Sequence, residues 1–249
     1  MSLKDQVVVI TGASRGIGRA IAESAAADGA SLVLCARSAE PLKETARALS
    51  KTADVLAVPA DASREDEVER LRDEAITRFG RVDAIVNNAG NAESMPFLKT
   101  ERAFWDRLIA ENATSAFLVS KAFIGGMAER GGGRIVMVAS VSGKRGAPYI
   151  AAYAAAKHAM LGLMRSLAAE FGPRGVRVNA VCPGYVDTPM TDRSVKNVAS
   201  KTGKSSGEAR KAMEQMNPQK RFLKPGEVAA AVLPLLDPAC RENGEAIDL

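Results

Sequence analysis

The sequence predicts a doubly wound α/β fold, in which helices cover both faces of a parallel β-sheet. Two observations support this prediction. Short β-branched runs alternate with helical stretches, and the runs are apolar throughout, as expected for strands that are buried on both faces. The predicted sheet is mostly parallel and seven-stranded, with strands at 7–10, 32–36, 55–59, 84–87, 134–139 and 176–182 and a shorter one, "EAID", at 245–248.

Two of the intervening helices carry start and stop signals. Ser63, followed by Asp66, is expected to cap one helix at its N-terminus, and Gly80 is expected to end it. Ser38 and Pro41 open another. The buried stripes of these helices are predicted at Val68, Leu71, Ala75 and Phe79, and at Leu42, Ala46 and Leu49.

The composition indicates one globular domain over residues 1–249. The chain is 47% hydrophobic and 25% charged, and no repeat or linker divides it. Its net charge of +5 permits binding to nucleic acid, anionic membranes or phosphorylated small molecules. The positive charges are scattered and no aromatic platform accompanies them, so we expect no nucleic-acid partner.

Cysteine usage and the termini indicate a cytoplasmic protein. The three cysteines lie far apart in sequence, without the spacing of a metal site or a disulfide framework, so neither is expected. The N-terminus lacks the regions of a signal peptide, and no apolar stretch is long enough to cross a bilayer.

A glycine-rich turn, "TGASRGIG" at 11–18, follows the first predicted strand and precedes an alanine-rich helix. Gly12, Gly16 and Gly18 allow a tight turn whose helix amides face an anion. The spacing differs from the commoner Gly-x-Gly-x-x-Gly pattern, and a glycine-rich turn alone can be a simple connection. Its place after the first strand favours dinucleotide binding.

The end of the second predicted strand distinguishes the two dinucleotides. NAD-binding proteins usually present an acid about 20 residues beyond the glycines, to the ribose hydroxyls. Ala36 and Arg37 occupy that place here, and Arg37 with Arg15 can pair with a 2′-phosphate. We therefore expect NADP in preference to NAD, although both arginines are also compatible with an ordinary solvated surface.

"YAAAK" at 153–157 places a phenol and an ammonium on one face of a predicted helix, one turn apart. An unperturbed tyrosine has a pKa of about 10. The ammonium of Lys157 favours the phenolate, so we expect it to lower the pKa of Tyr153 and to fit that residue for general acid–base catalysis. Ser140, at the end of a central strand, can donate a hydrogen bond to the same substrate oxygen.

Taken together, these motifs resemble the short-chain dehydrogenase/reductase family, in the order and approximate spacing of that family. The resemblance runs from about residue 5 to residue 230 and implies a single-domain, Rossmann-like fold. Within the family, the chain is similar to 3-oxoacyl-(acyl-carrier-protein) and acyl-CoA reductases. The motifs that carry it are "TGASRGIG", "NNAG" (87–90), Asn112 in "ENATSAF", Ser140, "YAAAK" and "PGYVDTP" (183–189).

The resemblance also implies site residues. Lys157 would bind the nicotinamide ribose as well as act on Tyr153, and Asn112 would help to carry a water-mediated proton path to it. Asp61 would lie near the adenine, although a turn-forming role fits it equally well. The implied cofactor contacts are Gly12, Ser14, Arg15, Gly16, Ile17, Gly18, Arg37, Asp61, Ala62, Asn88, Ala89, Gly90, Tyr153, Lys157, Pro183, Gly184, Val186 and Thr188.

The polar stretch at 188–222 corresponds to the segment that the family uses as a substrate lid. "SSGE" at 205–208 predicts a capping box and a short helix. A basic lid with an apolar face suits an acyl chain on coenzyme A or acyl carrier protein, and it suits a solvated helix flank equally. The apolar face is predicted at Ala209, Met213 and Met216, and the basic residues are Lys196, Lys201, Lys204, Arg210, Lys211, Lys220 and Arg221, with Arg130 and Arg174 near positions that are basic in carrier-dependent members.

The expected function is NADPH-dependent reduction of a ketone, foremost a 3-oxoacyl thioester, to a secondary alcohol. A dehydrogenase of a secondary alcohol or sugar and a non-catalytic NADP-sensing protein are the alternatives. The resemblance also implies a homotetramer that contacts through the helix bearing Tyr153. We expect packing or subunit-contact roles for His158 and core positions for Met137, Met160 and Met164.

Overall fold

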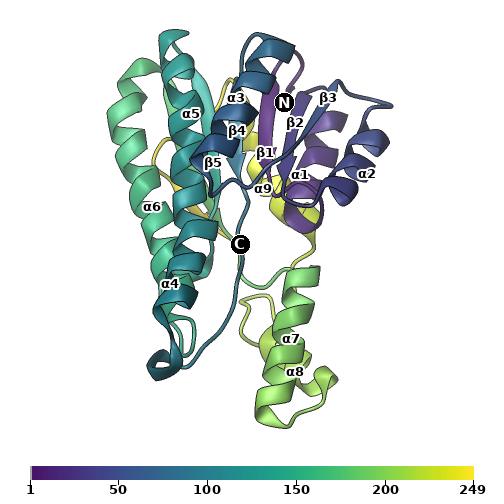
Figure 1. The fold of residues 1–249 in the computed structure, drawn as a ribbon, viewed down its shortest axis with the longest axis vertical. Helices are drawn as coiled ribbons and strands as arrows, with labels where there is room; N and C mark the ends of the chain where they lie inside the picture. Colours follow the sequence, from purple (N-terminus) through teal and green to yellow (C-terminus); the bar gives the residue numbers. More distant parts are fainter. Residues whose placement is uncertain (1) are drawn as a thin grey trace.

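A computed structural model describes residues 2–249 and contains one seven-stranded sheet (Figure 1). The strand order is β3-β2-β1-β4-β5-β6-β7, and every neighbouring pair is parallel. The predicted mostly parallel sheet is therefore confirmed. The strands are β1 Val7–Thr11, β2 Ser31–Ala36, β3 Val55–Pro59, β4 Ala84–Asn87, β5 Gly133–Val138, β6 Val176–Cys182 and β7 Ala246–Asp248.

The chain reverses its direction of winding at β1, which lies between β2 and β4. Because all strands are parallel, their carboxyl ends meet at one edge of the sheet. In a doubly wound fold, ligands bind in the crevice that this reversal opens at the carboxyl edge. The topology thus places the turns after β1, β4 and β5 beside one another.

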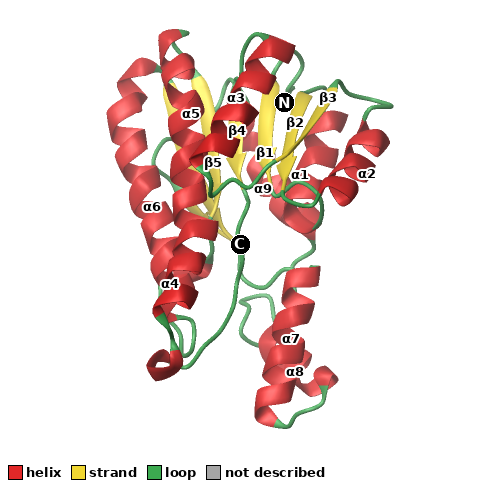
Figure 2. Cartoon of the chain, viewed as in Figure 1, coloured by secondary structure: helices red, strands yellow, loops and turns green. Residues whose placement is uncertain are grey.

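Helices pack on both faces of the sheet, as Figure 2 shows. Alternate residues of each strand supply the two cores: Val7 and Val9 of β1 join one, and Val8 and Ile10 join the other. One core is completed by α3, α5 and α6, and the other by α1, α2 and α9. These helices are α1 Gly16–Ala27, α2 Ala39–Leu49, α3 Glu65–Phe79, α5 Ser115–Glu129, α6 Ala151–Phe171 and α9 Pro225–Leu236.

The remaining helices lie toward the carboxyl edge or in the loops. In Figure 1, α7 and α8 extend beyond this edge, and they share a small core of their own with Phe222. The capping box of α8 is confirmed, because Ser205 and Glu208 exchange both of its hydrogen bonds. These elements are α4 Arg102–Ile109, α7 Pro189–Thr202, α8 Ser206–Glu214, a π-helical turn η2 Ala110–Thr114, and the 3₁₀ turns η1 Phe97–Lys99, η3 Val141–Gly143 and η4 Gly172–Arg174.

Two local predictions were wrong. Ser63 does not cap α3, which begins one residue after Arg64, because the Ser63 hydroxyl instead donates to Asp61 at 2.7 Å. Met216 does not join the apolar face of α8, since it lies beyond the helix and is 60% exposed. The stripe of α2, the end of α3 at Gly80 and the core positions of the three methionines are confirmed. In the stripe of α3, Val68, Leu71 and Ala75 are buried as predicted, and Phe79 packs partly buried against the same core.

Of the helices that residues 2–249 form, none combines the length and the apolar character that crossing a bilayer requires.

Candidate active site

The turn between β1 and α1 forms a cradle for an anion. Gly12 and Gly16 have φ angles of +67° and +58°, a backbone conformation that favours glycine. A Cβ atom on Gly18 would clash with the Asn88 side chain. Arg15 precedes α1 without any side-chain cap on the helix, so the first N–H groups of α1 can bind a ligand. The turn fits a dinucleotide pyrophosphate.

Asn88 and Ala89, at the end of β4, are tied directly to this cradle. The Asn88 side chain donates to the Thr11 carbonyl oxygen at 2.8 Å. The backbone N–H groups of Asn88 and Ala89 both donate to the Thr11 hydroxyl, at 3.0 and 2.9 Å. These bonds join the carboxyl ends of β1 and β4, so the structure brings the "TGASRGIG" and "NNAG" motifs together.

Ser140 and the Tyr153–Lys157 pair come from neighbouring elements at the same edge. Ser140 follows β5, is buried, and caps η3 by accepting a bond from the Ser142 N–H at 3.1 Å. Tyr153 and Lys157 lie one turn apart near the start of α6. The buried Lys157 ammonium donates to the Val138 carbonyl oxygen of β5 at 3.0 Å, which fixes α6 against the strand that carries Ser140.

The electrostatics of this pair differ from the prediction. The pKa of Tyr153 is not lowered: burial raises it to about 12, and the hydrogen bond with Ser140 offsets only part of that rise. Burial also lowers the pKa of Lys157 to about 8. The ammonium lies 5.8 Å from the centroid of the Tyr153 ring, and desolvation is the largest cause of the raised pKa of Tyr153. In the polypeptide alone, Tyr153 is therefore a protonated phenol at neutral pH.

Asn112 is fully buried within the π-helical turn η2. Its side-chain N–H groups donate to the carbonyl oxygens of Asn91 and Leu108, at 3.0 and 2.9 Å, but within residues 2–249 its side-chain oxygen has no partner. A Cβ atom on Gly90 would lie 2.5 Å from that oxygen and 3.6 Å from the Lys157 ammonium. Gly90 thus lets Asn112 and Lys157 approach each other across the end of β4.

A second group of predicted residues surrounds a cavity of about 290 Å³ at the ends of β2 and β3. Arg37 and Asp61 both line it. Asp61 also has the turn-forming role, since its carboxylate accepts bonds from the N–H and hydroxyl groups of Ser63. Arg37 forms an ion pair at 2.9 Å with Glu111, a residue that sequence reasoning missed. No spacing links positions 37 and 111, and only the acid beside Asn112 in "ENATSAF" could have suggested it.

The "PGYVDTP" segment leads from β6 toward α7. Val186 pairs with Leu223 in an isolated β-bridge, and Thr188 caps α7 by accepting a bond from the Thr191 N–H. A Cβ atom on Gly16 would lie 3.4 Å from the Thr188 side chain. The start of α7 therefore lies next to the cradle. Of the other predicted contacts, Ala62 is buried, and Ser14, Ile17 and Gly184 lie partly exposed near the carboxyl edge, with Pro183 buried beside Gly184.

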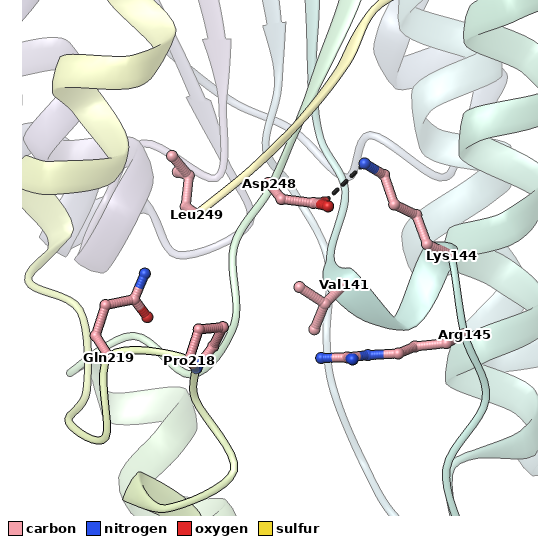
Figure 3. Close-up of a pocket in the computed structure, with 7 residues that line it drawn as sticks. All are labelled: Val141, Lys144, Arg145, Pro218, Gln219, Asp248 and Leu249. Atoms are coloured by element: carbon pink, nitrogen blue, oxygen red, sulfur yellow. Dashed lines mark ion pairs between the residues drawn. The ribbon is translucent and has the colours of Figure 1, made fainter.

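A cavity of about 380 Å³ lies beside the turn that follows Ser140, and Figure 3 shows its lining. Val141 and Arg145 face Pro218 across this cavity. Lys144 forms an ion pair with Asp248 at 2.7 Å. Across residues 2–249, no three His, Cys, Asp or Glu side chains gather in a way that could hold a metal ion.

The basic residues that could contact an acyl carrier lie in two parts of the fold, the amino edge of the sheet and the stretch at 188–222. Arg130 follows α5 and Arg174 follows α6, immediately before β5 and β6 begin. They therefore lie at the amino edge of the sheet, opposite Ser140 and Tyr153, and do not line the candidate site of the same chain. In the stretch at 188–222, Arg210 is paired with Asp187 at 2.8 Å.

Comparisons with known proteins agree with this geometry. The family described as short chain dehydrogenase matches residues 6–199. Levodione reductase from Leifsonia aquatica is 38% identical, over 98% of this chain and 92% of its own. A 3-oxoacyl-(acyl-carrier-protein) reductase from Salmonella typhimurium is 39% identical, over 77% of this chain and 78% of its own. A crystal structure of an actinorhodin polyketide ketoreductase variant with NADPH superposes with a TM-score of 0.93 at 35% identity, over 100% and 97% of the two chains.

The carboxyl-edge constellation, the strand order and these matches lead to one conclusion. The chain belongs to the short chain dehydrogenase family and is an NAD(P)-dependent oxidoreductase.

Proposed function

We propose that this protein uses NADPH to reduce a ketone, foremost a 3-oxoacyl thioester, to a secondary alcohol. The observation that carries the proposal is the meeting of Ser140 and Tyr153 at the carboxyl edge, with Lys157 anchored to β5 behind them. A bound nicotinamide dinucleotide supplies a hydride to the carbonyl carbon. The hydroxyl groups of Ser140 and Tyr153 stabilise the oxygen on which negative charge develops.

Tyr153 is the proton donor in this proposal. Its raised pKa keeps the phenol protonated at neutral pH, which is the state that reduction requires. The Lys157 ammonium uses two of its N–H groups on Val138 and Met160, so its third can serve a ribose or a water molecule. The unpartnered oxygen of Asn112 lies nearby and is suited to hold such a water molecule, as part of a path that returns a proton to Tyr153.

The preference for NADPH rests on the end of β2. Ala36 leaves no acid for the ribose hydroxyls, and Arg37 lines the cavity beside Asp61. The structural relative described above contains NADPH, which supports the same choice. In this proposal, the cradle glycines with Ser14, Arg15 and Ile17 bind the pyrophosphate. The segment from Pro183 to Thr188 meets the nicotinamide.

The proposed thioester substrate rests on the surroundings of Ser140 and on the relatives. Arg145 lines the cavity next to the Ser140 turn, where it suits a substrate with a polar or anionic portion, whereas the Lys144 ammonium beside it is paired with Asp248. One relative is named a 3-oxoacyl-(acyl-carrier-protein) reductase and another a putative ketoacyl reductase. We assign α7 and α8, within 188–222, as the lid that covers this substrate, because they extend past the carboxyl edge with a core of their own.

The assembly and location follow from the same proposal. Trp105 of α4 and Phe117 of α5 remain 36% and 46% exposed, although both are large aromatic side chains. Such a surface suits a subunit interface, so we propose a homotetramer. We propose a cytoplasmic location because the three cysteines are free thiols.

The experiment that tests the proposal is a substrate panel with NADPH and with NADH. Acetoacetyl-CoA should be reduced faster, at equal concentration, than simple ketones or sugars, and NADPH should serve better than NADH. Faster turnover of sugars or secondary alcohols would favour the dehydrogenase alternative. Stoichiometric NADPH binding without oxidation across the whole panel would favour a cofactor-sensing protein.

A further inference from the structure

Arg37, the proposed ligand of a cofactor 2′-phosphate, is held by an acid from a distant part of the chain. Its guanidinium Nη1 donates to a carboxylate oxygen of Glu111 at 2.9 Å. Arg37 follows β2, whereas Glu111 lies in the π-helical turn η2 after α4. The two residues are 74 positions apart, and only the fold brings them together.

Arg37 is the main cation that pairs with the Glu111 carboxylate. The only other cation near it, among residues 2–249, is Arg107 at 3.5 Å. Arg107 is already engaged by Glu93, which it contacts through two hydrogen bonds of 2.9 Å. The Glu111 side chain is only 12% exposed, so water compensates its charge incompletely.

Arg37, unlike Glu111, is mostly exposed to solvent. Its side chain is 59% exposed and lines the cavity of about 290 Å³ with Pro59, Ala60, Asp61 and Glu67. Only one of its nitrogens is hydrogen-bonded within the described chain, so its other N–H groups can reach a ligand. A phosphate in this cavity would meet a cation that Glu111 already partly neutralises.

We propose that Glu111 competes with the 2′-phosphate of NADP for Arg37 and so limits the preference of the enzyme for NADP over NAD. This inference rests on the proposed function, because it assumes that the cavity takes the adenosine end of the dinucleotide. Glu111 is a specificity-determining residue that acts through Arg37.

The test measures how a 2′-phosphate alone changes binding. Isothermal titration gives the dissociation constants of adenosine 5′-phosphate and adenosine 2′,5′-bisphosphate, and their ratio isolates the added group. Glu111→Gln should raise the preference for the bisphosphate about fivefold, the worth of one partly exposed charge interaction. A general effect on folding would change both constants together and leave their ratio constant.

Two further variants locate the effect. Glu93→Gln frees Arg107 to pair more closely with Glu111, so it should release Arg37 in part and raise the ratio by less than Glu111→Gln does. In an Arg37→Ala background, Glu111→Gln should change the ratio by less than about twofold, because the competition no longer exists. If Glu111→Gln does not fold, Glu111→Asp withdraws the carboxylate by one methylene and should raise the ratio by a smaller amount.

An unchanged or lowered preference for the bisphosphate in Glu111→Gln would overturn this inference. The same holds for Glu111→Asp where that variant replaces Glu111→Gln. A lowered preference would mean that Glu111 orients Arg37 for the phosphate. NADPH binding by the wild-type chain separates the two proposals. If NADPH binds but the ratio does not rise, only this inference fails. If neither probe nor NADPH binds, the proposed function fails with it.

Discussion

The ammonium of Lys157 and the ring of Tyr153 lie 5.8 Å apart, measured to the ring centroid, and the ammonium is anchored to the carbonyl oxygen of Val138. Lys157 therefore has a fixed position relative to both the phenol and the strand that leads to Ser140. The two residues therefore have different tasks: Tyr153 carries the proton, and Lys157 provides a positive charge at a fixed position beside it.

Removing the Tyr153 hydroxyl should abolish most turnover. Tyr153→Phe is expected to lower kcat by about 10²–10⁴-fold, the usual contribution of a positioned general acid. Binding of NADPH, followed by fluorescence, and the thermal unfolding midpoint should change little. Tyr149→Phe is a matched control, because Tyr149 is 64% exposed. Unchanged kcat in Tyr153→Phe, on a substrate that the wild type turns over, would contradict the proposed role.

Burial of Lys157 should make stability depend on alkaline pH. Its pKa falls from 10.5 in the unfolded chain to about 8 in the fold, so between these values the unfolded state binds more protons than the native state. The free energy of unfolding should therefore rise with pH in this window, by about 2 kcal/mol between pH 7 and 10.

Urea unfolding of the wild type and of Lys157→Met at several pH values checks this expectation. The difference between the two proteins should change with pH, because other titrating groups cancel. Tyr153 acts in the opposite direction at higher pH. Its pKa is raised from 10 to about 12, so the unfolded state loses this proton first, and the free energy of unfolding should fall as pH rises from 10 to 12. A difference that stays constant from pH 7 to 10 would mean that Lys157 is not desolvated.

The contact at Gly90 should not tolerate a methyl group. In Gly90→Ala the new Cβ atom would lie 2.5 Å from the Asn112 side-chain oxygen, so Asn112 or β4 must shift. We expect a loss of about 1–3 kcal/mol of stability and a fall of roughly tenfold or more in kcat. Gly146→Ala adds the same methyl group where no atom lies within 4 Å, and it should change neither quantity.

Loss of the capping box should loosen α8 without unfolding the protein. Ser205→Ala removes the hydroxyl that accepts from the Glu208 N–H at 3.2 Å, which should cost the helix about 1 kcal/mol. Because α7 and α8 have a separate small core, hydrogen exchange should quicken in this pair of helices while the sheet stays protected. The neighbouring Ser206→Ala keeps the cap and serves as control. Faster exchange across the whole sheet would contradict this independence.

Much of the fold could be predicted because its signals are local. The strands at 55–59, 84–87 and 176–182 have the predicted boundaries, since unbroken apolar runs mark strands that are covered on both faces. Gly80 ends α3 with a φ of +75°, as a glycine after an apolar stripe indicates. The misplaced N-cap at Ser63 arose from a competing local bond, because Asp61 takes the hydroxyl that would have capped the helix.

The site could be predicted only as far as its residue types. The spacing of Tyr153 and Lys157 and the place of Ser140 after a central strand predict these residues. The direction of the pKa shift of Tyr153 does not follow from the sequence, because it depends on burial at the junction of several elements. Glu111 could not be placed near Arg37 from sequence, since tertiary packing alone determines that contact. Electrostatic interactions between residues that are far apart in sequence are therefore the part of this site that could not be predicted.

The amino edge of the parallel sheet, opposite the candidate site, carries a cysteine that can be labelled. Cys240 lies between α9 and β7, and the neighbouring Asp237 accepts a bond from Arg134 at the start of β5. The chain's other two cysteines are buried, and burial raises the pKa of the Cys35 thiol to about 12, which leaves it inert. Cys240 is the least buried of the three cysteines, although burial raises the pKa of its thiol as well. A maleimide dye would therefore attach at Cys240 first, and there it would report on the amino edge of the sheet without obstructing the candidate site.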